Sequence, residues 1–129
     1  MVQAEGKSFP FDGVEHIQPE LLETFPYEYP TRDAEIELEC EEWNCVCPFS
    51  GLPDFGCLSI HYVPGEVCLE LKSFKYYLTS FRTVGIYQEH AANRVLEDLV
   101  AACAPRKMEV VLDYRLRGGI HTVVTVRYP

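Results

Sequence analysis

The stretch "AEIELECEEW", residues 34–43, decides the fold class because its apolar and charged side chains alternate one by one. Ile36, Leu38 and Cys40 are separated from one another by single glutamates. A period of two is typical of a strand with one buried face and one solvated face. The stretch therefore predicts the first strand of a sheet that exposes an acidic face.

The pattern continues through a second strand and then changes to helical spacing. "FGCLSIHYV", residues 55–63, is rich in β-forming residues, and Pro64-Gly65 turns the chain into a short apolar piece, "EVCLEL", where this strand ends. Apolar residues then recur at helical spacing in "KSFKYYLTSFRTVG", residues 72–85, and in "EHAANRVLEDLVAAC", residues 89–103. Two helices are expected, separated near Gly85 and closed by Pro105.

Two more strands complete the chain, over Met108 to Tyr114 and Ile120 to Tyr128, with Gly118-Gly119 in their connection. The order ββααββ predicts an α+β fold, a four-stranded antiparallel sheet with two helices on one face. Such a sheet has an uncovered face and two free edges, which a neighbouring copy can cover by continuing the sheet into a barrel. We therefore expect an oligomer.

The first 33 residues differ from the rest in composition. They are rich in proline and aromatic residues and have weak periodicity, so residues 1–33 are expected to form an extended arm with one short helical turn around Pro19 to Thr24. Residues 34–129 are expected to form the single folded domain that a chain of this length allows.

Charge and hydropathy exclude several classes of function. The formal net charge is −9, with 20 acidic and 11 basic side chains, which argues against a nucleic-acid binder and against attachment to an anionic membrane. Residues 1–13 lack the basic and apolar pattern of a targeting signal, and the sequence has no apolar run of membrane-spanning length. The sequence predicts a cytoplasmic protein.

Six cysteines raise the question of disulfides or metal, because six thiols can pair as three bonds. Nothing in the sequence indicates secretion, so reduced thiols are expected. Cys45, Cys47, Cys57 and His61 also offer four zinc ligands, although their spacing differs from that of common structural zinc sites. A zinc site stays an open alternative.

Chemistry is most plausible around "CPFSGLPDF", residues 47–55, because its two prolines and one glycine predict a loop. Loops that present a thiol and a carboxylate, here Cys47 and Asp54, are common places for catalysis. A small buried cysteine is the alternative interpretation of Cys47.

Two further groups of polar residues lie beside the predicted helices. Glu70 ends an apolar stretch, and Lys72 and Lys75 project to one side of the first helical turn, where they suit a phosphate group or a solvated face. Gln88 and Glu89 begin the second helix, where they suit either the edge of a purine-like ring or a favourable helix terminus.

Five motifs occur together in one order: "LETFP", "CPFSGLPDF", "LELKSFKYY", "FRTVGIYQEHAAN" and "RGGI". In this order and spacing the chain resembles the unimodular QueF family, NADPH-dependent nitrile reductases that make 7-aminomethyl-7-deazaguanine for queuosine. The resemblance covers residues 22 to about 128. It implies the T-fold, with the same ββααββ order, and assembly into barrel-forming rings, commonly a decamer of two stacked pentamers.

The resemblance also implies residue roles. Cys47 corresponds to the nucleophile that forms a covalent thioimide with the nitrile of 7-cyano-7-deazaguanine, and Asp54 to the proton donor. Leu69, Glu70 and Leu71 correspond to one segment that contacts the deazaguanine, and Gln88 and Glu89 to another. Lys72 and Lys75 are the expected NADPH-binding residues, with Arg117 of "RGGI" assisting. No metal, membrane or direct nucleic-acid partner is implied.

Two positions depart from the family pattern. Gln88 stands where many members have histidine, and Ala91 stands where some members have a cysteine that can protect the nucleophile in a disulfide. Two rival functions stay open: a zinc-dependent T-fold enzyme acting on a pterin or purine, and a non-enzymatic binding module for a purine-like ligand. Bound zinc would indicate the first, and absence of nitrile-dependent NADPH oxidation would indicate the second.

Overall fold

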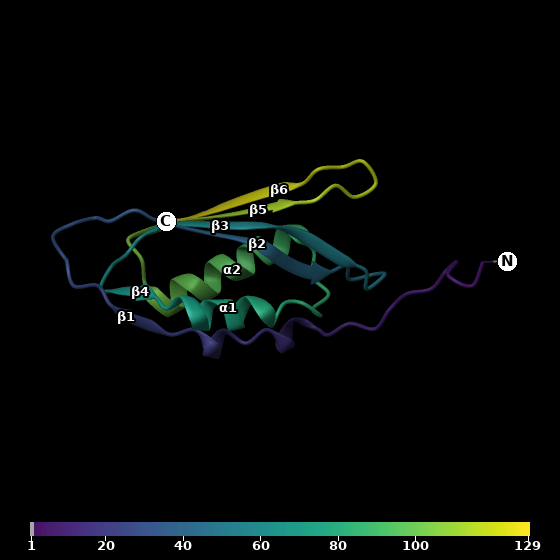
Figure 1. Cartoon of the computed structure of the whole chain (residues 1–129), viewed down its shortest axis with the longest axis horizontal. Helices are drawn as coiled ribbons and strands as arrows, with labels where there is room; N and C mark the ends of the chain where they lie inside the picture. The colour runs from purple at the N-terminus through teal and green to yellow at the C-terminus, as the bar shows by residue number, and fades with distance from the viewer. Residues whose placement is uncertain (1) are drawn as a thin grey trace.

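A four-stranded antiparallel sheet forms the centre of the structure, a computed structural model that describes residues 2–129. Its strands are β2 (Ile36–Val46), β3 (Pro53–Val63), β5 (Lys107–Tyr114) and β6 (Val123–Tyr128), hydrogen-bonded in that order (Figure 1). The predicted α+β class and the antiparallel four-stranded sheet are therefore confirmed.

A β-bulge explains why the alternation that predicted β2 does not run through its whole length. The register against β3 shifts between Cys40 and Trp43. Before the shift the even-numbered Leu38 packs against the core, and after it the odd-numbered Trp43 and Cys45 are buried. The extra residue thus changes which parity faces inward, as a bulge does. The bulge allows the last residues of β2 to bury their side chains just before Cys47.

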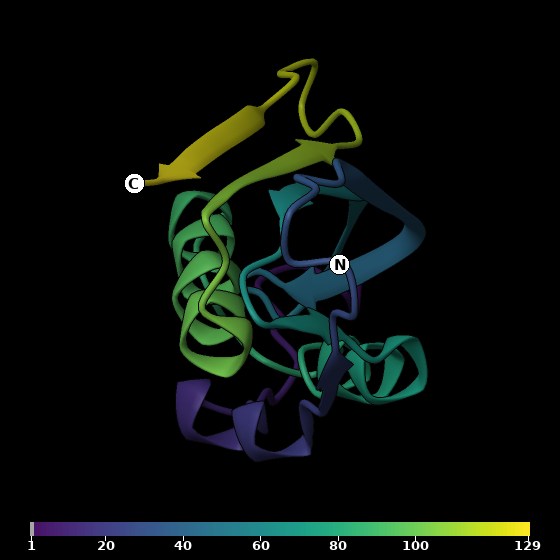
Figure 2. The ribbon, with the colours of Figure 1, turned by 90° about the vertical axis from the view of Figure 1, so that its left-hand side faces the viewer.

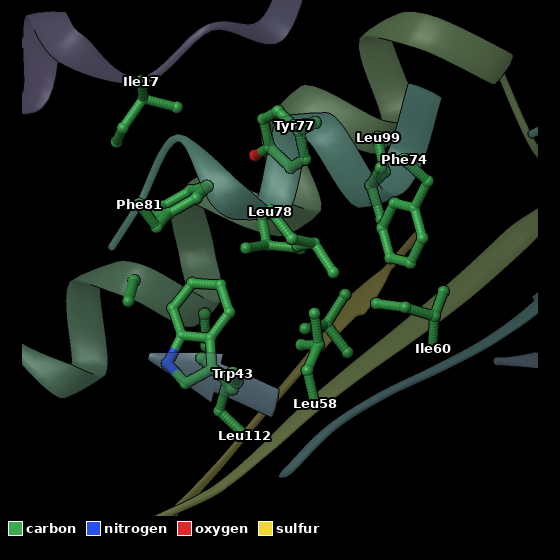
Figure 3. Close-up of a cluster of buried hydrophobic side chains, with 14 of the residues drawn as sticks. Ile17, Trp43, Leu58, Ile60, Phe74, Tyr77, Leu78, Phe81, Leu99 and Leu112 are labelled. Atoms are coloured by element: carbon green, nitrogen blue, oxygen red, sulfur yellow. The ribbon is translucent and has the colours of Figure 1, made fainter. Parts of the chain in front are cut away.

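Two helices, α1 (Leu71–Thr79) and α2 (Gln88–Cys103), lie on one face of this sheet (Figures 1 and 2). Figure 3 shows aromatic and aliphatic side chains from α1, α2 and the sheet meeting in one apolar core. The labelled members of this core include Trp43, Leu58, Ile60, Phe74, Tyr77, Leu78, Phe81, Leu99 and Leu112. Within residues 2–129 no helix lies on the opposite face of the sheet, and the edge strands of the sheet are β2 and β6.

The N-terminal segment is more ordered than the sequence indicated. Two short 3-10 helices, η1 (Val14–His16) and η2 (Pro19–Leu21), are followed by β1 (Thr24–Pro26), which pairs with β4 (Val67–Leu69) in a separate two-stranded sheet. Ile17, between the 3-10 helices, is 4% exposed and joins the core. The short apolar piece after Pro64-Gly65 therefore pairs with the arm, which the sequence did not predict. The division at residue 34 stays a prediction.

The helices of the described chain also bear on membrane association. None of the helices in residues 2–129 is long and apolar enough to span a membrane.

Candidate active site

The loop that carries Cys47 connects β2 to β3 and is closed by its own backbone. The Cys47 N–H donates to the carbonyl oxygen of Leu52 at 2.8 Å, and the Gly51 N–H donates to the carbonyl oxygen of Cys47 at 2.9 Å. Two prolines and Gly51 predicted this loop, but its predicted end at Phe55 is wrong, because β3 already begins at Pro53. Proline is compatible with the first position of a strand, so Asp54 lies on β3 instead of in the loop.

Asp54 is a buried carboxyl with one ionic partner. Only 3% of the residue is exposed, and its backbone pairs with Cys45 across the sheet. The Nη1 atom of Arg117 lies 2.7 Å from its Oδ1 atom. Burial raises the pKa of Asp54, while the charge and hydrogen bond of Arg117 oppose that rise. The result is a carboxyl that holds a proton more readily than a solvated aspartate does.

The Cys47 thiol differs from the nearby thiol of Cys45, which lies on β2. Burial disfavours its ionisation, but hydrogen bonds from Ser50, from the Phe49 backbone and from Arg117 outweigh burial and lower the pKa of Cys47 to about 7. Cys45 is fully buried, and burial together with the charge of Asp54 raises its pKa to about 12. Of these two thiols, Cys47 is therefore the one that ionises near neutral pH.

Two residues connect the thiol to its surroundings in ways that the sequence did not indicate. Arg117, on the connection between β5 and β6, contacts both Cys47 and Asp54, although the resemblance associated it with the cofactor. Its side chain is 46% exposed, so an outer part stays accessible to a ligand. Ser50 was not predicted to have a role, and the sequence feature that could have indicated one is its position three residues after Cys47.

The start of α2 lies beside the β2–β3 loop that carries Cys47, the predicted nucleophile, and we call this loop the nucleophile loop. Val46 pairs with Gly85 in a short parallel bridge, and the rings of Phe49 and Tyr87 meet edge to face, 5.8 Å apart. The hydroxyl of Tyr114 donates to the backbone carbonyl of Gln88 at 3.4 Å. These contacts bring Gln88, and the exposed Glu89 after it, to the same end of the molecule as Cys47.

The residues around the start of α1 form a second group. The Glu70 carboxylate accepts the backbone N–H of Ser73 at 2.7 Å and that of Lys72 at 2.9 Å, so Glu70 caps the helix, and these bonds lower its pKa. Leu69 is buried and Leu71 is 57% exposed.

The side chains of Lys72 and Lys75 are exposed, and neither forms an ion pair within residues 2–129.

The predicted site residues are thus separated into two groups within one chain. Figure 1 shows the β2–β3 loop and the β5–β6 connection at one end of the sheet, and β4, which leads into α1, near the other end. The nucleophile group consists of Cys47, Asp54, Arg117, Gln88 and Glu89, and the α1 group consists of Leu69, Glu70, Leu71, Lys72 and Lys75. A single chain does not bring the two groups together.

The hollows of the chain are consistent with this separation. Two surface hollows, each of about 760 Å³, lie elsewhere, the first lined in part by Arg106 and Arg127 and the second by Cys57 and His121. Neither is lined by Cys47 or Glu70. Neither hollow therefore includes a predicted site residue in its lining.

The four residues considered as zinc ligands do not form a metal centre. Within residues 2–129 no three His, Cys, Asp or Glu side chains are arranged to hold a metal ion. The zinc-dependent alternative is therefore not supported.

Comparisons with known proteins agree with the motifs. The family described as QueF-like protein matches residues 53–129. A protein of Caldicellulosiruptor bescii named NADPH-dependent 7-cyano-7-deazaguanine reductase is 51% identical over 122 residues, which cover 95% of this chain and 93% of that protein. A protein of Anaeromyxobacter sp. (strain K) with the same name is 56% identical over 107 residues, covering 83% of this chain and 88% of that protein.

A solved structure is similar in fold. The crystal structure of the archaeosine synthase QueF-Like in the apo form matches with a TM-score of 0.69 and 26% identity, covering 74% of this chain and 94% of that chain. The family match over most of the antiparallel sheet and both helices, together with relatives about half identical over most of their length, shows that this chain belongs to the QueF-like family.

Proposed function

We propose that this chain reduces the nitrile of 7-cyano-7-deazaguanine to the aminomethyl group with NADPH, in the biosynthesis of queuosine. The names of its relatives support the substrate and the cofactor. The observation that carries the proposal is the pairing of an ionisable thiol, Cys47, with a buried carboxyl, Asp54, through the shared partner Arg117.

Cys47 is the proposed nucleophile. A nitrile carbon accepts a hydride poorly, so a prior covalent step lowers the barrier. The Cys47 thiolate adds to the nitrile carbon, a C–S bond forms, and one π bond of the nitrile becomes a lone pair on nitrogen that takes a proton. The product is a thioimide, whose carbon is a better hydride acceptor. With a pKa of about 7, a large fraction of Cys47 is already thiolate at neutral pH.

Asp54 is the proposed source of that proton. Its burial favours the neutral acid that a proton donor needs, whereas Arg117 at 2.7 Å favours the carboxylate. Arg117 therefore opposes protonation of Asp54 while it stabilises the thiolate of Cys47. A shift of Arg117 toward another anionic group would release Asp54 to its protonated form.

The deazaguanine is proposed to lie between the two groups of residues. Glu70 and Glu89 have carboxylate oxygens that accept ring and amino N–H groups, and Gln88 can both donate and accept. The exposed Leu71 beside Glu70 offers apolar contact for the ring, whereas Leu69 is buried and belongs to the apolar core. Glu70 already uses its two oxygens to cap α1, so the helix holds this carboxylate in a fixed orientation.

NADPH is proposed to bind at Lys72, Lys75 and the exposed part of Arg117. The structure fits an anionic group here, because both ammonium groups project from the first turns of α1 and lack an ionic partner among residues 2–129. When bound, NADPH supplies the hydride, and two molecules are consumed for each nitrile.

The separation of the two groups supports a site shared by neighbouring chains. We propose a ring-shaped homo-oligomer, with a decamer of two stacked pentamers as the expected form, in which β2 or β6 of one chain continues the sheet of the next. The α1 group of one chain then faces the nucleophile group of its neighbour.

Mass spectrometry tests the covalent step. The protein incubated with 7-cyano-7-deazaguanine and no NADPH should gain the mass of one ligand per chain, and peptide mapping should place it on Cys47. An adduct on another cysteine, or none at saturating nitrile, contradicts the proposed mechanism.

A further inference from the structure

The proposed chemistry gives no role to the N-terminal arm, yet the arm contacts the segments on both sides of Cys47. The Phe9 N–H donates to the carbonyl oxygen of Ser50 at 2.7 Å, inside the nucleophile loop. Three residues later, the Asp12 N–H donates to the carbonyl of Thr83 at 2.8 Å, and the Gly85 N–H donates to the carbonyl of Asp12 at 2.9 Å. We call residues 9–12 the strap.

Two glycines lie where the strap crosses the molecule. A Cβ added at Gly51 would lie 2.3 Å from the backbone oxygen of Phe9, and Gly51 also has a positive φ of 72°. A Cβ added at Gly85 would lie 2.3 Å from the ring of Phe11. At Gly51 the backbone of Phe9 leaves no room for a Cβ, whereas at Gly85 a Cβ would require the Phe11 ring to move.

The two contacts lead directly to Cys47. On one side, the backbone oxygen of Ser50 accepts the Phe9 N–H of the strap. The hydroxyl and the N–H of the same Ser50 form hydrogen bonds that stabilise the Cys47 thiolate. On the other side, residues 83–86 hold Val46: its N–H donates to the carbonyl of Val84 at 3.0 Å, and its carbonyl accepts the Ile86 N–H at 3.2 Å. The same segment continues into Gln88 and Glu89 at the start of α2.

We propose that residues 9–12 are a positioning segment, which holds the nucleophile loop and the start of α2 so that Ser50 stays against the Cys47 thiol. Phe9, through its N–H, and Asp12 are the positioning residues. Asp12 also accepts the hydroxyl of Thr83 at 2.5 Å, which fixes the far end of the strap. The inference rests on the proposed role of Cys47, but its test uses neither nitrile nor NADPH.

The test is the pH profile of Cys47 alkylation by iodoacetamide in the full chain, followed by mass spectrometry of the Cys47 peptide. Phe9→Pro removes the N–H that binds Ser50. The charged groups around the thiol, Arg117 and the Asp54 bound to it, are unchanged in this variant. Loss of the Ser50 contacts should raise the alkylation midpoint by about one pH unit, which slows the reaction about fivefold at pH 7.

Two matched controls isolate the hydrogen bond. Phe9→Ala keeps the N–H, and Ser8→Pro adds a proline at a neighbouring position whose N–H makes no hydrogen bond within residues 2–129. Both should retain the wild-type profile. A Phe9→Pro profile equal to wild type, or an equal shift in Ser8→Pro, overturns the proposal.

Asp12→Ala provides a second variant if Phe9→Pro does not fold, because the Asp12 side chain is half exposed and its loss is compatible with the fold. It should slow alkylation at pH 7 about twofold to threefold, by releasing the Thr83 contact. An unchanged profile in that case overturns the proposal. The two proposals can fail separately. If the Cys47 thiol titrates near pH 7 and its alkylation profile shifts in the strap variants, but no nitrile adduct forms, the proposed function is wrong and the positioning role of the strap is still supported.

Discussion

The two groups of site residues differ in how far one chain completes them. Around Cys47, Arg117 contacts both the thiol and Asp54, and Ser50 forms hydrogen bonds to the thiol. These hydrogen bonds lower the pKa of Cys47, while burial raises the pKa of Asp54. Around the start of α1, Lys72 and Lys75 face solvent without ionic partners among residues 2–129, and the Glu70 carboxylate accepts two backbone N–H groups of its own helix.

Thiol ionisation and ligand binding therefore have different structural requirements in this protein. Ionising a thiol needs fixed, partly buried donors, and one chain supplies them. Binding a purine-like ring and a phosphate needs only a rigid surface that presents carboxylates and cations, and we propose that α1 supplies that surface at the other end of the sheet. Substitutions in the nucleophile group should therefore affect reactivity, and those in the α1 group should affect binding.

The largest effect is expected at the nucleophile. Cys47→Ala should abolish both the nitrile adduct and NADPH oxidation, and should still bind 7-cyano-7-deazaguanine, which calorimetry can measure. Cys45→Ala is the matched control, because Cys45 is buried and its pKa is raised to about 12, so it should keep the adduct with a stability loss of about 1 kcal/mol. Turnover by Cys47→Ala would contradict covalent catalysis.

The next largest effect separates proton donation from addition. Asp54→Asn preserves the size of the side chain but removes the acid, so turnover should fall about a hundredfold or more. The ordinary steady-state assay of NADPH absorbance measures this loss, with Arg115→Ala as a control on an exposed residue nearby. Turnover within a few fold of wild type would remove Asp54 from the mechanism.

The fold was largely predictable because its signals are local. Periods of two and of 3.6 identified the four strands of the sheet and both helices. The pairing of β1 with β4 was not predictable, because Thr24–Pro26 is three residues long, includes a proline, and pairs with residues more than 40 positions away. The early start of β3 was missed because Pro53 suggests a loop when neighbouring strands are unknown.

A smaller effect is expected in the α1 group. Lys72→Ala combined with Lys75→Ala should raise the KM for NADPH about tenfold and that for NADH less, because the ribose 2′-phosphate loses its cations. Lys7→Ala, on the exposed arm, is the matched control. Equal losses for both cofactors would show that the lysines hold the shared pyrophosphate, and unchanged KM values would exclude cofactor binding there.

The smallest effect concerns the ionisation of Cys47. Arg117 stabilises the thiolate by a hydrogen bond, so Arg117→Ala should raise the pKa of Cys47 above about 7. Alkylation should then be about threefold slower at pH 7 and should converge with wild type near pH 9, where both thiols are largely ionised. A midpoint equal to that of Arg115→Ala would remove Arg117 from thiolate stabilisation.

The site was less predictable than the fold, because its contacts join distant parts of the chain. Cys47 and Asp54 were identified through motifs, but the ion pair between Asp54 and Arg117 spans 63 positions and has no local pattern. Ser50 and the strap were not predicted, since a backbone hydrogen bond such as that from Phe9 to Ser50 depends on no side-chain type. The roles of the predicted catalytic, substrate and cofactor residues stay predictions.

Complementation between two inactive variants tests most directly the claim that two chains share each site. Cys47→Ala lacks the nucleophile, and the variant Lys72→Ala with Lys75→Ala and Glu70→Ala lacks the α1 group. Co-expressed in equal amounts, they should recover about a quarter of wild-type NADPH oxidation, because about one interface in four combines an intact nucleophile group with an intact α1 group. If the mixed oligomers oxidise NADPH no faster than the separate variants combined, each site is built by one chain and the proposed arrangement is wrong.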